Sequence, residues 1–179
     1  MAFPCDRHLP DAHDACFRAV AVEAPPSVVF RWCCQLKAAP YSYDWVDNLG
    51  RRSPRTLTPG LERLTVGERV ATIFRLVDFE PDRHLTMLLR NSPVFGDVAV
   101  TYLVAPALEG TARARLIVKL LVRYPGPAFL RPVWARLLPL GDLVMMRRQL
   151  LNLKSLAEAD ARAGRAGPMR GPDTEVRTR

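Results

Sequence analysis

Long apolar runs are missing from this sequence of 179 residues. The longest apolar stretch, residues 137–146, is interrupted by Pro139, Gly141 and Asp142, whereas a membrane-spanning helix needs about 18 consecutive apolar residues. The first fifteen residues also lack the apolar segment of a secretory signal, because Asp, Arg and His are scattered through them. Together these absences predict a cytoplasmic protein.

Lysine is scarce, and phosphate-binding loops are absent. Only three of the 26 basic residues are lysines, so the net charge of +8 rests on arginine. No Gly-rich dinucleotide loop or Walker motif occurs, which excludes the nucleotide-binding classes that these loops define. The basic residues between 111 and 123 carry no interleaved aromatics, so we interpret them as a solvated strand face and expect no nucleic-acid partner.

Metal-binding and catalytic motifs are equally few. The four cysteines are expected to be reduced thiols. Two pairs, Cys5 with His8 and His13 with Cys16, offer ligands of the types that zinc prefers, but the loop between the pairs is atypically short. The remaining histidine, His84, has no motif-placed serine for a nucleophilic triad. It is also the only histidine in the predicted core region, whereas a mononuclear iron site needs two. We therefore expect no metal and no cofactor.

Composition and length fit one globular domain. Apolar residues make up 49% of the chain and charged residues 25%, which is ordinary for a soluble fold. A core domain over residues 16–163 is predicted, between an irregular N-terminal arm (1–15) and a basic, disordered tail (164–179).

The N-terminal part of this domain predicts a strand and a helix. Residues 17–23 are small and apolar, as in a strand, and the prolines that follow suit a first helical turn. The spacing of four apolar residues then puts them on one face of a helix that ends before Pro40: Val29, Trp32, Cys33 and Leu36. Residues 40–60, rich in aromatics and then in turn formers, predict a loop, or a short helix followed by a loop.

The middle of the chain predicts a run of antiparallel strands. A short strand is expected at residues 61–64 and a long one at 69–79. Further strands are expected at 84–90, 98–105 and 111–122, with a hairpin turn at Glu109-Gly110. The last strand alternates clearly, with one apolar face formed by Ala114, Leu116, Val118, Leu120 and Val122.

The C-terminal part predicts helices. A short helical stretch at 129–138 is expected to break at Pro139 and Gly141, before a long helix over 142–163. One apolar stripe runs along that helix: Leu143, Met146, Leu150, Leu153 and Ala157. Strands and helices segregated in this way indicate an α+β fold, with a curved antiparallel sheet wrapped around the long helix and room for an apolar molecule between them.

Three sequence blocks carry a resemblance to a known family. They are Ala24-Pro25-Pro26-Ser27-Val28-Val29-Phe30, Val66-Gly67-Glu68-Arg69-Val70 and residues 146–154. In this order they resemble the START-like (SRPBCC, helix-grip) superfamily, and Tyr41-Ser42-Tyr43-Asp44-Trp45 is similar to a bacterial subgroup described as polyketide-cyclase-like. The resemblance implies the helix-grip fold over residues 16–160. It supplies no shared catalytic motif, because the superfamily spans lipid carriers, hormone binders and polyketide cyclases.

Three functions follow as hypotheses. The first is binding or transport of a small, lipid-like or polyketide-like molecule between sheet and helix. Its predicted ligand-binding residues are Tyr43, Trp45, Phe74, Leu76, Met87, Leu89, Leu116, Val118, Leu120, Met146 and Leu150. The second is a cyclase or dehydratase whose acid–base groups are Tyr41, Tyr43 and Asp44. The third is a membrane-surface or partner-binding module at 124–146, where Phe129 and Trp134 are rimmed by arginines. The sequence leaves catalysis and oligomeric state open.

Overall fold

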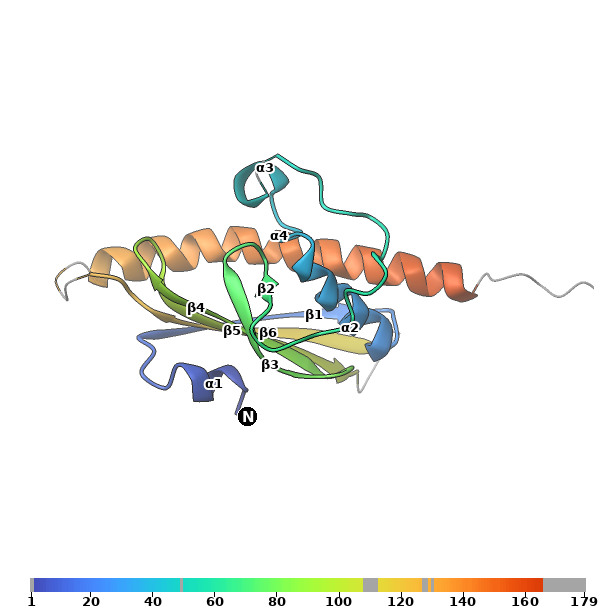
Figure 1. Ribbon diagram of the computed structural model, residues 1–179, viewed down its shortest axis with the longest axis horizontal. Coiled ribbons are helices and arrows are strands. Elements are labelled where there is room, and N and C mark those ends of the chain that lie inside the picture. The colour runs from blue at the N-terminus through green and yellow to red at the C-terminus, as the bar shows by residue number, and fades with distance from the viewer. Residues whose placement is uncertain (1, 49, 108–112, 127–128, 130, 166–179) are drawn as a thin grey trace, which may run out of the picture.

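One antiparallel sheet organises the molecule. The structure, a computed structural model, describes residues 2–48, 50–107, 113–126, 129 and 131–165. In these residues six strands pair in the order β1-β6-β5-β4-β3-β2 (Figure 1). The strands are β1 (Asp14–Val22), β2 (Arg69–Val70), β3 (Phe74–Glu80), β4 (His84–Ser92), β5 (Gly96–Pro106) and β6 (Ala114–Arg123). The predicted hairpin turn at Glu109-Gly110 lies outside the described residues, as does most of the predicted tail.

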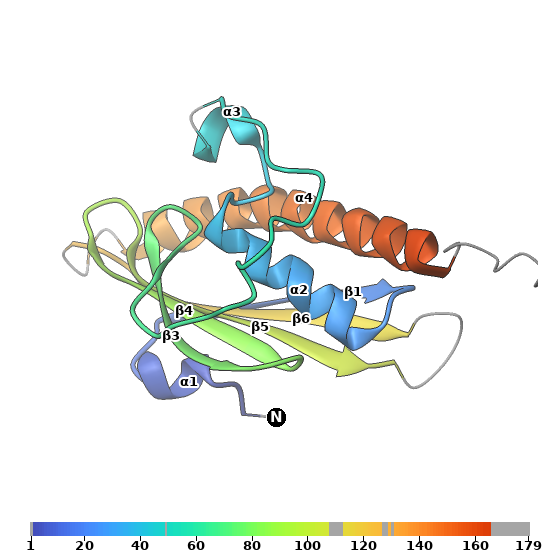
Figure 2. The ribbon, with the colours of Figure 1, turned by 45° about the vertical axis from the view of Figure 1, so that its right-hand side comes forward.

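Helices cover both faces of the sheet. The long α4 (Arg131–Arg165) and the shorter α2 (Pro26–Cys34), which continues into the 3-10 turn η1 (Gln35–Lys37), lie on one face (Figures 1 and 2). The single turn α1 (Cys5–His8) lies on the opposite face, and α3 (Asp44–Asp47) sits beyond α4, away from the sheet. The α+β helix-grip architecture predicted from the sequence is therefore confirmed.

Strand alternation decides which side chains meet the helices. Leu116, Val118 and Leu120 of β6 pair with alternate residues of β5 and face α2 and α4. On α2 and η1, all four residues of the predicted apolar face are buried, and Trp32 Nε1 donates a hydrogen bond to Asp160 Oδ2 of α4 at 3.0 Å. The main core lies between the inner face of the sheet and the two helices.

The N-terminal arm differs from the expectation of an irregular segment. Phe3, Cys5 and Leu9 are buried against the outer face of the sheet, where they meet a second apolar cluster that includes Ala99, Leu103 and Leu121. The backbone N–H of Cys5 also donates to Thr101 Oγ1 at 3.0 Å. Three apolar residues at uneven spacing form no helical or strand period, which is why the sequence pattern does not reveal this packing.

A buried carboxylate fastens the arm to the sheet. Asp97 accepts hydrogen bonds from the backbone N–H of Asn91 (2.7 Å), from Arg90 (3.2 Å) and from Arg123. Arg123 also reaches Asp11, and Arg90 donates to the carbonyl of His8. Burial alone would raise the pKa of Asp97, but the hydrogen bonds to its charged form outweigh burial and hold the pKa below its usual range.

The Asp97→Asn substitution is expected to lower the free energy of unfolding at pH 7 by about 2 kcal/mol, because hydrogen bonds to a charged group are lost. A lowered native pKa stabilises the fold above the unfolded pKa of about 3.9, and this stabilisation disappears as pH falls through the native value. Urea unfolding should therefore show the two proteins converging below about pH 4. The exposed Asp11→Asn is the control and should change little. A gap that persists at pH 2 would contradict this account.

Two strand predictions were wrong. Residues 61–64 form no strand, because they lie between Gly60 and Gly67, whose positive φ angles of 87° and 93° turn the chain on both sides. The single strand predicted over 69–79 is split into β2 and β3 by a tight turn. There Ala71 and Thr72 have φ of 44° and 68°, and Ile73 N donates to Ala71 O at 2.8 Å.

The predicted break before the last helix was also wrong. α4 continues through Pro139 and Gly141 as one helix of 35 residues. An interior proline costs a helix about 3 kcal/mol and a glycine about 1 kcal/mol. Packing of α4 against β1 and α2 outweighs this cost. Met146, Leu150, Leu153 and Ala157 of the predicted stripe are buried, whereas Leu143 at its start is exposed.

Candidate ligand cavity

A cavity of about 420 Å³ lies between the inner face of the sheet and α4. Its walls come from strands β3 to β6, from the turn before β3, from residues 40–42 and from α4. The lining residues are Pro40, Ser42, Ala71, Ile73, Phe74, Met87, Phe95, Val98, Val100, Tyr102, Leu120, Val122, Gly141, Met145, Met146 and Gln149.

The cavity exists because the two helices do not cover the sheet equally. At one end Trp32 and Leu36 fill the space between sheet and α4. At the other end α4 is the only helix among the described residues that lines the space over the sheet, and one of its lining positions, Gly141, has no side chain. The floor is apolar because Met87, Val100 and Leu120 are register neighbours on three adjacent strands and point to the same face.

A hydrogen-bonded polar group stands in the otherwise apolar wall. Tyr102 donates its hydroxyl proton to Gln149 Oε1 at 2.5 Å, and Gln149 Nε2 donates to the carbonyl of Pro40 at 2.5 Å. One turn along α4, Asn152 Nδ2 donates to the carbonyl of Tyr41 at 2.8 Å. These two amides hold the backbone where Tyr41 adopts a φ of 57°, a conformation that bulky residues rarely take.

The structure places only part of the predicted ligand-binding set at this cavity. Phe74, Met87, Leu120 and Met146 line it. The others pack in the adjoining core or lie elsewhere. Those in the core are Leu76, Leu89, Leu116, Val118 and Leu150. Tyr43 is half-buried before α3, and Trp45 is 78% exposed on α3, so neither reaches the cavity wall.

The predicted acid–base residues are also away from the cavity. Tyr41 is buried with its ring edge-on to Trp32, at 6.1 Å between ring centres. Burial, assisted by the charge of Asp44, raises the pKa of Tyr41 to about 12. Asp44 accepts hydrogen bonds from Ser53 N (3.0 Å) and Ser53 Oγ (2.5 Å), which fix the start of α3. Neither these two residues nor Tyr43 lines the cavity.

Sequence reasoning missed the polar group of the wall. Tyr102 alternates with Val98 and Val100 in a predicted strand, so the period of two already placed it on their face. Gln149 falls between Met146 and Leu150 at the edge of the apolar stripe of α4, where a polar residue is conspicuous. Ser42 carried no such signal.

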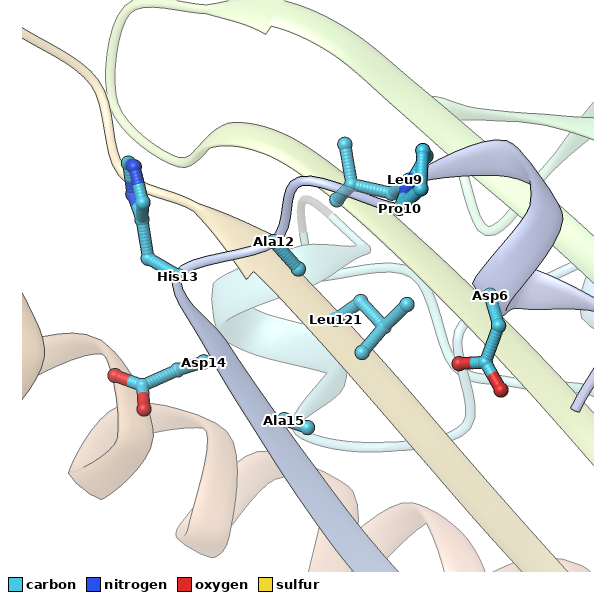
Figure 3. A pocket seen from close by; sticks show the side chains of 8 residues that line it. All are labelled: Asp6, Leu9, Pro10, Ala12, His13, Asp14, Ala15 and Leu121. Atoms are coloured by element: carbon cyan, nitrogen blue, oxygen red, sulfur yellow. The ribbon is translucent and has the colours of Figure 1, made fainter. Parts of the chain in front are cut away.

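A second hollow lies on the outer face, between the arm and strands β1 and β6. Figure 3 shows Asp6 on one side of it and His13 and Asp14 on the other, with Leu121 between them. Its volume is about 460 Å³. Its carboxylates already have partners, because Asp6 pairs with Lys119 at 2.5 Å and Asp14 accepts the hydroxyl of Tyr124. This groove is therefore explained by the attachment of the arm.

The cysteine pairs and the aromatics that the sequence singled out elsewhere lie in different parts of the structure. Cys5 lies on the outer side of the sheet, whereas Cys16 pairs in register with Leu120 of the inner face. Phe129 is exposed, and Trp134 packs partly against the main core. Among the described residues, no helix combines the length and apolarity needed to cross a bilayer.

Comparison with known proteins gives matches in structure but not in sequence. No protein-family model matches the chain, and a search of curated proteins finds no match. Protein CV1439 from Chromobacterium violaceum aligns with a TM-score of 0.51 at 16% identity, over 80% of this chain and 96% of its own. The Staphylococcus aureus protein of unknown function SA2116 aligns with a TM-score of 0.53 at 10% identity, over 83% and 96%.

A third similar structure has two domains. It is the di-domain ARO/CYC StfQ from the steffimycin biosynthetic pathway, with a TM-score of 0.51 at 12% identity. The alignment covers 88% of this chain but only 54% of StfQ, so the chain spans about half of that protein. Likeness at such identities is a likeness of fold, and it agrees with the sheet and helix arrangement described above. The chain therefore shares its fold, the α+β helix-grip fold, with these proteins.

Proposed function

We propose that this protein binds a small, mostly apolar molecule in the cavity between its sheet and α4. The observation that carries the proposal is the cavity itself, which has a volume of about 420 Å³ and, among the described residues, sixteen lining positions with no charged side chain. Ligand sites of small molecules are concave, mostly apolar and of about 300–1,000 Å³, with a few placed polar groups. Tyr102 and Gln149 are polar groups of this kind.

A lipid-like or polyketide-like ligand fits this wall best. The neighbour StfQ belongs to a biosynthetic pathway, which makes a polyketide-type molecule a reasonable first ligand to test. Binding or transport explains the wall without a catalytic group, because none of the described residues that line it carries a carboxylate, imidazole, thiol or ammonium group.

Filling the cavity is expected to abolish binding. Val100 lies on the cavity floor, so Val100→Trp places an indole in the ligand space. Titration with the neutral probe 1-aminoanthracene, followed by fluorescence, should show saturable binding to the unchanged protein. The variant should bind about tenfold more weakly or worse, since each 1.4 kcal/mol of lost contact is a factor of ten.

The exposed Val66→Trp is the matched control and should bind as the unchanged protein does. Native mass spectrometry of gently purified protein would then identify any ligand carried from the host. Equal probe affinity in a folded Val100→Trp protein, or no saturable binding to the unchanged protein, would count against the proposal.

A further inference from the structure

The side-chain amide of Gln149 has one orientation that satisfies its surroundings. The carbonyl of Pro40 can only accept, so the amide atom 2.5 Å from it must be the nitrogen. The amide oxygen then faces Tyr102, whose hydroxyl donates to it at 2.5 Å. Both side chains are buried, and neighbouring groups thus fix the amide without reference to any ligand.

In this orientation, one of the two N–H groups of the Gln149 amide makes no hydrogen bond to another described residue. An amide nitrogen carries two N–H groups, and Pro40 receives one of them. In the part of the chain that the structure describes, the side chain of Gln149 makes no other hydrogen bond than those to Tyr102 and Pro40. Gln149 lines the cavity, and a buried N–H gains free energy when it meets an acceptor, so an oxygen atom of a bound molecule would be a favourable partner for this second N–H.

The charge of the wall limits the ligand further. Of the lining residues that the structure describes, none is a lysine, arginine or histidine that could offset an anion, and none carries a carboxylate that could offset a cation. Transfer of an unpaired charge into such a wall costs far more than one hydrogen bond returns. The hydroxyl proton of Tyr102 is already given to Gln149, whereas the second N–H of Gln149 is not used by another described residue, so Gln149 can donate to a ligand.

We infer that the cavity selects neutral molecules with a carbonyl-type oxygen, and that Gln149 donates a hydrogen bond to that oxygen. The inference rests on the proposed function, since it names the ligand class of the same cavity. It makes Gln149 a specificity-determining residue, separate from the apolar walls that supply most of the contact.

Three naphthalene probes of similar shape test the inference with the full chain. They are 2-acetylnaphthalene (neutral, with a carbonyl), 2-isopropylnaphthalene (neutral, without oxygen) and 2-naphthoate (anionic). Calorimetry gives the dissociation constant of each for the unchanged protein and for Gln149→Met, which keeps the length of the side chain but has no amide. For each protein we compare the dissociation constant of the hydrocarbon with that of the ketone. Their ratio isolates the contribution of the carbonyl group, because the general affinity for apolar compounds affects both constants equally.

This ratio is expected to fall about five- to tenfold in Gln149→Met, the worth of one hydrogen bond. The naphthoate should bind the unchanged protein about 100-fold more weakly than the ketone, because its charge is not compensated. Asn152→Leu is the matched control, because it also removes an amide that holds the 40–41 backbone but does not line the cavity. An equal fall of the ratio in Asn152→Leu would overturn the assignment to Gln149.

Infrared spectroscopy supplies a reading that needs no variant, should Gln149→Met fail to fold. A hydrogen bond lowers the carbonyl stretching frequency of bound 2-acetylnaphthalene relative to the same ketone in an apolar solvent, and an unshifted band would overturn the inference.

Failure of the proposed function and failure of the role of Gln149 give different results. If no probe binds, the cavity is not a ligand site, and both proposals fall. If the hydrocarbon and ketone bind with a ratio that Gln149→Met leaves unchanged, only the role of Gln149 is overturned.

Discussion

Gly96→Ala is expected to lower the free energy of unfolding by about 3–5 kcal/mol. Gly96 begins β5 with a φ of +71°, and a Cβ atom there would lie 2.1 Å from the carbonyl oxygen of Arg123 and 2.9 Å from Pro125 N. Both are backbone atoms, so the end of β6 must move. The adjoining Phe95 and Val98 line the cavity, so probe binding should weaken as well.

Gly67→Ala separates this clash from the cost of the backbone conformation. Gly67 has a φ of +93°, but no atom lies within 4 Å of the position that an added methyl group would take. Its substitution should cost only about 1–2 kcal/mol, the penalty of a left-handed conformation. Urea unfolding of both variants gives the comparison. Equal losses in the free energy of unfolding would show that the end of β6 can move at Arg123 at no measurable cost.

Leu9→Ala is expected to cost about 3 kcal/mol, as in a well-packed core, although Leu9 belongs to the N-terminal arm. Leu9 is 1% exposed and belongs to the apolar cluster that the outer face of β5 and β6 forms with the arm. Thermal unfolding of Leu9→Ala should therefore show a clear fall in Tm.

Two controls locate the source of that loss. Arg7→Ala removes an exposed ion pair with Asp78 on the same arm and should cost less than about 1 kcal/mol. Val66→Ala removes an exposed apolar side chain and should stay within about 0.5 kcal/mol. If Leu9→Ala behaves like either control, the arm does not contribute to the folded core.

Periodic features of the fold were predictable from the sequence. Alternation in β6 and helical spacing in α2 place apolar residues on one face, and these faces are buried. Burial of a whole face is a large, repeated effect, so it leaves a pattern that a few exceptions do not hide. The order of these elements was enough to identify the helix-grip fold.

Features decided by single contacts were not predictable. The turn at Ala71 and Thr72 depends on the Ala71 N–H reaching the carbonyl of Leu36 at 2.8 Å, a contact between segments far apart in the chain. Trp45 was predicted to bind the ligand, yet α3 carries it outward, where it is exposed. Likewise, the pairing of Tyr102 with Gln149 joins residues 47 positions apart, and no local pattern encodes it.

Strand β5 has a consequence for how this protein could change. Its residues Val98, Val100 and Tyr102 face the cavity, while the alternating Ala99, Thr101 and Leu103 face the arm. The even-numbered positions of this part of β5 thus shape the cavity, whereas the odd-numbered positions pack against the arm. Mutations that reshape the cavity can accumulate while the arm's packing stays intact, so new ligand preferences could be selected, or engineered, on β5 without rebuilding the other half of the protein.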